Sequence, residues 1–183
     1  LGLTDEIRGH ADRMAAAGYL ALAPNLYTAG GAVRCLVATF RTLNTGRGKA
    51  IEDLAAARRY LLDAQDCTGK VGIIGFCMGG GFALLMAGEK HEFHASAVNY
   101  GQLPRHPEQA LRGACPIVAS YGSRDLSLRG AADRLKRVLT ELGVEHDIQE
   151  YPRAGHSFLN VEYFGPGVLR PAERIVGLGP SPA

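Results

Sequence analysis

The chain has 183 residues, of which 46% are hydrophobic, and a formal net charge of +2 from 20 basic and 18 acidic side chains. This length suffices for one domain with its own core and is short for two. Because the charges are spread along the chain, the composition favours neither a nucleic-acid nor a membrane partner, and a small-molecule partner is the simplest expectation. No apolar run reaches the roughly 20 residues that cross a bilayer, so we expect a soluble, cytoplasmic protein. The sequence indicates no particular oligomeric state.

In the first third of the chain, the sequence predicts two helices with a less regular region between them. Residues 4–18 have apolar side chains at helical spacing, with Thr4 as N-cap and a glycine at the end. Residues 19–26, YLALAPNL, are expected to form a short apolar strand. Residues 28–46 are expected to be an irregular excursion with one short helix, and residues 48–65 an amphipathic helix.

The remainder of the chain alternates apolar strands with helices. Strands are predicted at 70–76, 94–101, 115–123 and 144–152, and helices at 79–89 and 130–143. This alternation predicts an α/β fold with a mainly parallel sheet and helices on both faces, a three-layer sandwich. The last strand alternates apolar and polar residues, as a less buried strand would.

Three chemically reactive residues follow three of these predicted strands. Cys77 comes after 70–76, Asp125 after 115–123 and His156 after 144–152. In an open α/β sheet, ligands bind at the carboxyl ends of the strands, so we expect these side chains to lie together. A thiol, an imidazole that accepts its proton and a carboxylate that orients the imidazole are the groups that nucleophilic acyl transfer requires.

The sequence around Cys77, GFCMGG, has the G-x-nucleophile-x-G pattern of a nucleophile elbow. We expect side chains at Gly75 and Gly79 to collide with neighbouring backbone at a sharp strand-to-helix turn. The turn would place Cys77 at a helix N-terminus, which favours a thiolate, and would aim the backbone N–H of Met78 at a developing oxyanion. The other cysteines, Cys35, Cys67 and Cys115, lack such surroundings and form no disulfide or zinc pattern, so we expect structural roles for them.

These motifs resemble the dienelactone hydrolases (carboxymethylenebutenolidases) of the α/β-hydrolase fold. GFCMGGGFAL is similar to their elbow, YGSRDLSL to their aspartate loop and AGHSF to their histidine loop, and the resemblance extends over about residues 1–160. It implies that Cys77 is the nucleophile, His156 the general base and acid, Asp125 the orienting carboxylate and Met78 one oxyanion donor. It also implies hydrolysis of a small ester or lactone through a thioester, without a metal or an organic cofactor.

The sequence departs from the family pattern in three places. In the family, an acidic residue near the cysteine and a second oxyanion donor precede the segment that matches LGLTDEI. The family also has a last helix beyond the segment that matches residues 165–183. We therefore expect residues 1–183 to form a single α/β-hydrolase domain that lacks the first strands and the last helix. Dienelactone-cleaving members carry an arginine four residues after the histidine, where this chain has Asn160, which puts that substrate in doubt.

Two alternatives remain open at the level of the sequence. A strand, a glycine-rich turn and a helix also occur in nucleotide-binding domains, but the dinucleotide pattern G-x-G-x-x-G laid from Gly75 has Cys77 at its second glycine, and no acidic residue occurs in 95–99. The second alternative is a non-catalytic domain on a hydrolase fold, since a fold by itself does not imply activity.

Overall fold

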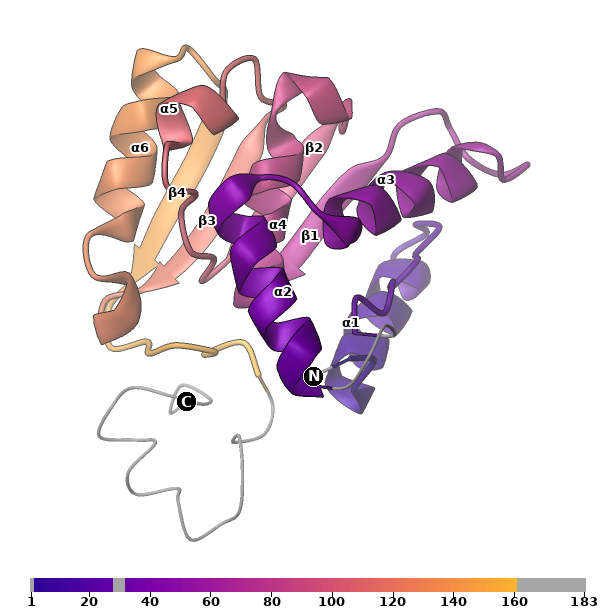
Figure 1. Cartoon of the computed structure of the whole chain (residues 1–183), viewed down its shortest axis with the longest axis horizontal. Coiled ribbons are helices and arrows are strands. Elements are labelled where there is room, and N and C mark those ends of the chain that lie inside the picture. Colours follow the sequence, from indigo (N-terminus) through magenta and orange to yellow (C-terminus); the bar gives the residue numbers. More distant parts are fainter. Residues whose placement is uncertain (1, 28–31, 161–183) are drawn as a thin grey trace, which may run out of the picture. The chain divides into compact units, whose positions relative to one another are not determined.

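The structure, a computed structural model, describes residues 2–27 and 32–160, with the backbone alone for residues 32–37. The chain divides into two compact units, Leu1–Val71 and Gly72–Ala183. Figure 1 shows helices of the first unit in indigo to purple and the strands of the second unit in magenta to orange. In the described ranges no helix is both long and apolar enough to cross a lipid bilayer.

The described elements of the first unit are three helices: α1 (Asp5–Ala16), α2 (Ala32–Thr45) and α3 (Lys49–Leu62). Helices α1 and α3 confirm the prediction, and the Thr4 side chain caps α1 by accepting the N–H of Ile7 at 3.4 Å. Helix α2 has 14 residues and is longer than the short helix expected. Among its described side chains, from residue 38 on, the buried ones are Thr39, Thr42 and Leu43, and two of these are polar.

The strand predicted at 19–26 is wrong, since residues 19–25 have no regular structure. Tyr19, Leu20 and Leu22 are 66%, 51% and 41% exposed. A strand needs a neighbouring strand to bond its backbone N–H and C=O groups. The described elements of this unit are helices, so the apolar segment has no such partner within it.

The second unit is a parallel sheet with helices, as predicted. The core of this unit lies on one face of the sheet, and the expected covering of both faces stays a prediction. Its four strands lie in the order β1 (Gly72–Phe76), β2 (Ala95–Asn99), β3 (Ile117–Gly122) and β4 (His146–Tyr151). Helix α4 (Met78–Ala87) follows β1, α6 (Ala131–Glu141) precedes β4, and a short helix α5 (Pro107–Ala110) lies between β2 and β3. Strand β4 is an edge strand and is mostly exposed, as its alternating sequence predicts.

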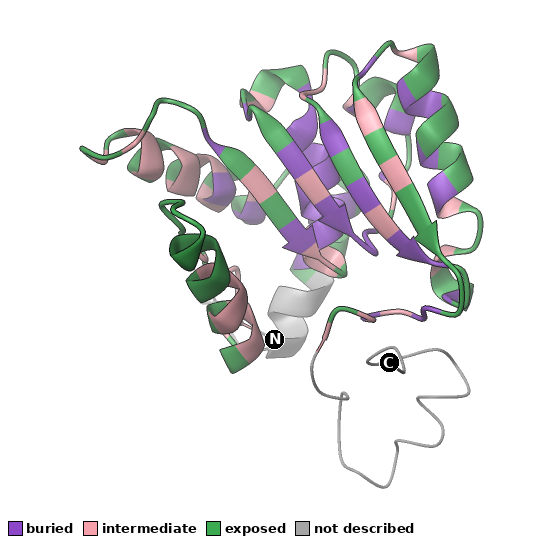
Figure 2. Ribbon diagram, turned by 180° about the vertical axis from the view of Figure 1, so that it is seen from behind, coloured by how far each residue is buried: buried purple, intermediate pink, exposed green. Residues whose placement is uncertain are grey.

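The core of this unit lies between one face of the sheet and the helices α4 and α6. Leu84 of α4, Leu135 of α6, and Val98 and Ile117 of the sheet are nearly inaccessible and pack in one cluster. Along β1 to β3, more buried residues alternate with less buried ones, except at the carboxyl ends of β2 and β3, where two consecutive residues are buried (Figure 2). Such alternation is the pattern of strands with one packed face. All four strands run in the same direction, so their carboxyl ends meet at one edge of the sheet.

Candidate active site

Cys77 is the single residue between strand β1 and helix α4. Its backbone has φ 54° and ψ −119°, a conformation that L-residues rarely adopt. A non-glycine residue held in such a region costs on the order of 1–3 kcal/mol and persists only where its surroundings fix it. Here the N–H of Cys77 donates to the carbonyl of Asn99 at 3.0 Å, and the Cys77 carbonyl accepts the N–H of Gly81 at 3.2 Å. The side chain is exposed at the start of the helix, as expected for an elbow.

The glycines around Cys77 allow backbone segments to approach one another. A Cβ added at Gly75 would lie 1.9 Å from the carbonyl oxygen of Gly79, as expected for the first flank. The same expectation for Gly79 is wrong, since a Cβ there meets no described atom within 4 Å. The constraint falls instead on Gly80, where a Cβ would lie 2.7 Å from both the Asn99 carbonyl oxygen and the Gly101 Cα. Successive helical residues point about 100° apart, so Gly80 and not Gly79 faces the chain after β2.

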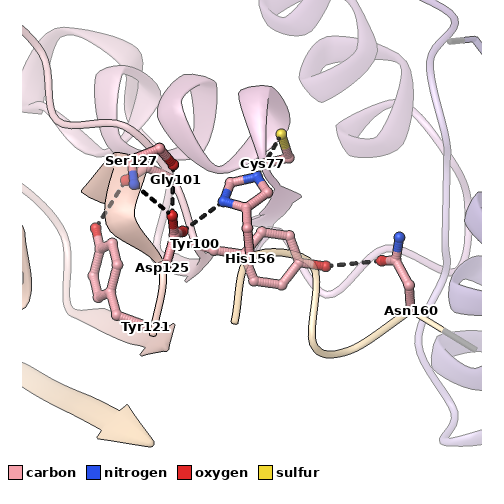
Figure 3. Close-up of polar contacts among 8 residues, drawn as sticks. All are labelled: Cys77, Tyr100, Gly101, Tyr121, Asp125, Ser127, His156 and Asn160. Carbon is pink, nitrogen blue, oxygen red and sulfur yellow. Dashed lines mark hydrogen bonds and ion pairs between the residues drawn. The ribbon is translucent and has the colours of Figure 1, made fainter. Parts of the chain in front are cut away.

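Cys77, His156 and Asp125 form a continuous series of polar contacts (Figure 3). Nε2 of His156 lies 3.0 Å from Sγ of Cys77, and Nδ1 of His156 lies 2.5 Å from Oδ2 of Asp125. The three residues follow the ends of β1, β4 and β3. The three residues expected to lie together are thus brought together by parallel strands that end at the same edge.

Asp125 is a buried carboxylate, with 3% of its surface exposed. Its second oxygen, Oδ1, accepts the backbone N–H of Ser127 at 3.0 Å and the Ser127 hydroxyl at 2.5 Å. Burial would raise the pKa of Asp125, but the hydrogen bonds from His156 and Ser127 outweigh it and hold the pKa below its ordinary value. The carboxylate is therefore ionised at neutral pH and can fix the Nδ1–H tautomer of His156.

His156 lies between two groups that stabilise its protonated form. Burial lowers its pKa, but the hydrogen bonds and charges of Asp125 and Cys77 outweigh burial and raise the pKa to about 9. The imidazole is therefore a strong proton acceptor in contact with a thiol.

Two residues of the site were not predicted from the sequence. Ser127 holds the outer oxygen of Asp125, and Tyr100, the residue after β2, packs its ring on His156 with centroids 5.2 Å apart. The strand-end argument, applied to β2 as to the other strands, would have included Tyr100. A Ser two residues after an Asp is a common side-chain-to-backbone turn, which is the available signal for Ser127. Asn160 accepts the Tyr100 hydroxyl through Oδ1 at 3.1 Å.

Cys67 and Cys115 take no part in the contacts among Cys77, His156 and Asp125. Cys67 and Cys115 are half-buried free thiols, and burial raises the pKa of Cys115. The side chain of Cys35 lies outside the described residues. Among the residues described, no group of three or more His, Cys, Asp or Glu side chains is arranged to hold a metal ion.

Comparison with known proteins shows what this chain is similar to in sequence and in fold. A protein of Methylorubrum extorquens AM1, provisionally named a carboxymethylenebutenolidase, is 31% identical over 173 residues, an alignment that covers 86% of this chain and 60% of that protein. The dienelactone hydrolase of Anabaena variabilis superposes with a TM-score of 0.62 at 24% identity, covering 95% of this chain and 77% of that structure. The dienelactone hydrolase-like phosphotriesterase P91 superposes with a TM-score of 0.69 at 22% identity, covering 98% and 74%.

The first two curated relatives, from Methylorubrum extorquens and Yersinia pestis, are matched over 60% and 66% of their own lengths. The chain thus spans about two thirds or less of these relatives. The family model described as the dienelactone hydrolase family matches residues 1–164. The fold, the strand-end site and this match agree, and the chain belongs to the dienelactone hydrolase family of the α/β-hydrolase fold.

Proposed function

We propose that this protein hydrolyses a small carboxylic ester or lactone, with Cys77 as the nucleophile of a Cys–His–Asp triad. The observation that carries the proposal is the pair of contacts made by His156, 3.0 Å to the Cys77 sulfur and 2.5 Å to the Asp125 carboxylate. The strained backbone of Cys77 supports it, because strain of this kind concentrates at functional sites. The names of the curated relatives support the class of substrate.

In the acylation step, Nε2 of His156 takes the thiol proton and the Cys77 sulfur attacks the carbonyl carbon of the substrate. A C–S bond forms, and the carbonyl oxygen becomes an oxyanion. We infer that the backbone N–H of Met78, the first residue of α4, donates to this oxygen, a contact typically worth about 3–4 kcal/mol in the transition state. The intermediate then expels an alkoxide or enolate, which takes the proton back from His156.

In the deacylation step, His156 removes a proton from water, and the resulting hydroxide attacks the thioester carbonyl. The C–S bond breaks, the thiolate regains a proton, and the carboxylic acid leaves. Each step uses only Cys77, His156 oriented by Asp125, and backbone N–H groups, so the proposed mechanism requires no metal or organic cofactor. Because a thiolate is a better leaving group than an amide nitrogen, the intermediate formed from an amide would revert, and esters and lactones are the favoured substrates.

A test of this proposal compares hydrolysis of 4-nitrophenyl acetate and of an enol lactone by the parent chain and by Cys77→Ala. We expect kcat/KM to fall at least about a thousandfold in the variant. Asp125→Asn should also lower kcat strongly, because His156 loses the acceptor that fixes its tautomer. Mass spectrometry of acid-quenched parent should detect one acetyl group on Cys77.

Cys67→Ala is the matched control, since Cys67 is also a free thiol but takes no part in the contacts among Cys77, His156 and Asp125. It should keep the parental rate. Undiminished hydrolysis by Cys77→Ala would exclude the thiol nucleophile. If NAD stabilised the parent in a thermal shift and no ester were hydrolysed, the nucleotide-binding alternative would be favoured. The structure argues against that alternative, because the space at Gly75 and Gly80 is occupied by the protein's own backbone.

A further inference from the structure

Tyr100 is a buried aromatic residue with an unusual backbone conformation. It directly follows strand β2, its φ is 40°, and its side chain is 1% exposed. A residue with a large side chain rarely adopts positive φ, because its Cβ crowds the backbone. Such a conformation is retained only where the neighbouring structure fixes the residue.

The backbone around Tyr100 is packed against the turn that carries the nucleophile. The N–H of Tyr100 donates to the Ser120 carbonyl at 2.7 Å. At the next residue, Gly101, an added Cβ would lie 2.4 Å from the carbonyl carbon of Gly80, in the first turn of α4. The position of Tyr100 is therefore fixed relative to Cys77, three residues before Gly80.

The ring of Tyr100 packs against the loop that carries the imidazole. Its centroid lies 5.2 Å from that of His156, with the planes at 60°, and 5.5 Å from that of Phe158. Both distances fall in the range of favourable tilted aromatic pairs. The ring thus limits the orientations that the imidazole can adopt.

The hydroxyl of Tyr100 contacts the same loop at its other end. It donates to Oδ1 of Asn160 at 3.1 Å (Figure 3). The N–H of Asn160 in turn donates to the Ser157 carbonyl at 3.0 Å. One side chain therefore contacts both ends of the loop 156–160.

We propose that Tyr100 is a positioning residue for His156. This inference rests on the proposed function, because it assigns Tyr100 a part in the Cys77–His156 pair. The bond from Nδ1 to Asp125 allows the imidazole to tilt about that contact, and displacement of Nε2 by about 1 Å can cost a hundredfold in rate. The ring of Tyr100 prevents the tilt, and its hydroxyl holds the loop, so that Nε2 remains in contact with the sulfur of Cys77.

The test uses Tyr100→Phe, which keeps the ring, Tyr100→Leu, which removes it, and Tyr151→Leu as a matched control. Tyr151 also packs on Phe158, with centroids 5.4 Å apart, but lies on the edge strand β4. Two quantities are measured: the rate of Cys77 alkylation by iodoacetamide between pH 5 and 10, followed by mass spectrometry, and kcat and KM for 4-nitrophenyl acetate. Alkylation needs no acyl substrate, so it reports on the Cys77–His156 pair separately from hydrolysis.

We expect Tyr100→Leu to slow alkylation at pH 7 about tenfold and to move its pH profile upward, with kcat about a hundredfold lower and KM within twofold. Tyr100→Phe should restore the alkylation profile, while loss of the hydroxyl lowers kcat about fivefold. Tyr151→Leu should behave as the parent. Parental alkylation and kcat in Tyr100→Leu would overturn the inference, and so would equal losses in Tyr151→Leu, which would indicate general packing.

If Tyr100→Leu does not fold, as judged by circular dichroism, the inference is tested with Tyr100→Phe and Asn160→Ala instead. The inference then requires a fall in kcat of about fivefold in each, with no further fall when the two are combined. Parental kcat in Tyr100→Phe would refute it. If the parent is alkylated at Cys77 but hydrolyses no ester, the proposed function fails while the alkylation series still tests Tyr100.

Discussion

The imidazole of His156 has a pKa that depends on its neighbours more than on burial. Burial lowers this pKa, yet the hydrogen bonds and charges of Asp125 and Cys77 raise it to about 9. Carbamidomethylation of Cys77 converts the sulfur to a thioether that carries no charge, so we expect the pKa of His156 to fall. Asp125→Asn should lower it as well, because burial then acts with less opposition.

An NMR titration of the imidazole protons measures both changes, with alkylated and unalkylated protein compared in the same buffer. The same titration of Cys67→Ala controls for the loss of a thiol elsewhere. A pKa of His156 that stays the same after alkylation would mean that the Cys77 sulfur does not interact with the imidazole.

Gly75 and Gly79 flank the nucleophile symmetrically in sequence but not in space. Gly75→Ala would place a Cβ 1.9 Å from the Gly79 carbonyl oxygen, whereas Gly79→Ala meets no described atom within 4 Å. We expect Gly75→Ala to lower the free energy of unfolding by about 3 kcal/mol or more, since backbone must move. Gly79→Ala should be neutral or stabilising by up to about 1 kcal/mol, because alanine favours a helix. Urea denaturation compares the pair, and equal losses would contradict this.

At the scale of the elements, α6 and α1 differ in how much apolar surface they bury. Leu135 of α6 is fully buried in the core cluster, whereas α1 has no buried residue and its Met14 is 37% exposed. Leu135→Ala should lower the free energy of unfolding by about 2–5 kcal/mol, and Met14→Ala by less than about 1 kcal/mol. Denaturation followed by circular dichroism tests this, and a larger loss for Met14→Ala would reverse the ranking.

The sequence predicted an element correctly where its local pattern of apolar residues matched the neighbours that it packs against in the fold. Strands β1 to β4 and helices α4 and α6 have apolar runs or stripes of the right period, and each is found. Residues 19–26 have the same apolar composition, but a strand depends on a neighbour that local sequence does not identify. The length of helix α2 was underestimated, and two of the buried residues in its described part, Thr39 and Thr42, are polar and do not mark an apolar face.

The candidate site, like the secondary structure, could be predicted only in part from the sequence. Parallel strands bring their carboxyl ends to one edge of the sheet. Because Cys77, Asp125 and His156 each follow a predicted strand, the sequence alone predicted that they lie together. The contacts of Tyr100 and Ser127 depend on distances between side chains that no spacing in the sequence specifies. The packing that falls on Gly80 instead of Gly79 likewise depends on how α4 is rotated against the chain after β2.

At the scale of the whole molecule, the site links stability to pH through two groups with opposite signs. The pKa of Asp125 is lowered in the folded protein from its ordinary value of 3.8. Its contribution to stability is therefore present above that value and is lost as pH falls through the folded pKa. The pKa of His156 is raised from 6.5 to about 9. Its contribution is complete below 6.5 and is lost as pH rises toward 9, because only the folded state then retains the proton.

The contribution of His156 can be isolated by comparing the parent with His156→Gln across pH. We expect the difference in free energy of unfolding to be largest below pH 6.5 and to shrink between 6.5 and about 9, by at most about 1.4 kcal/mol per pH unit. Urea denaturation at half-unit steps of pH measures it, and His146→Gln, at the other end of β4, reports what replacing a histidine outside the site contributes. A difference that stays constant across this range would show that the folded protein does not hold the proton on His156 more tightly than the unfolded chain does.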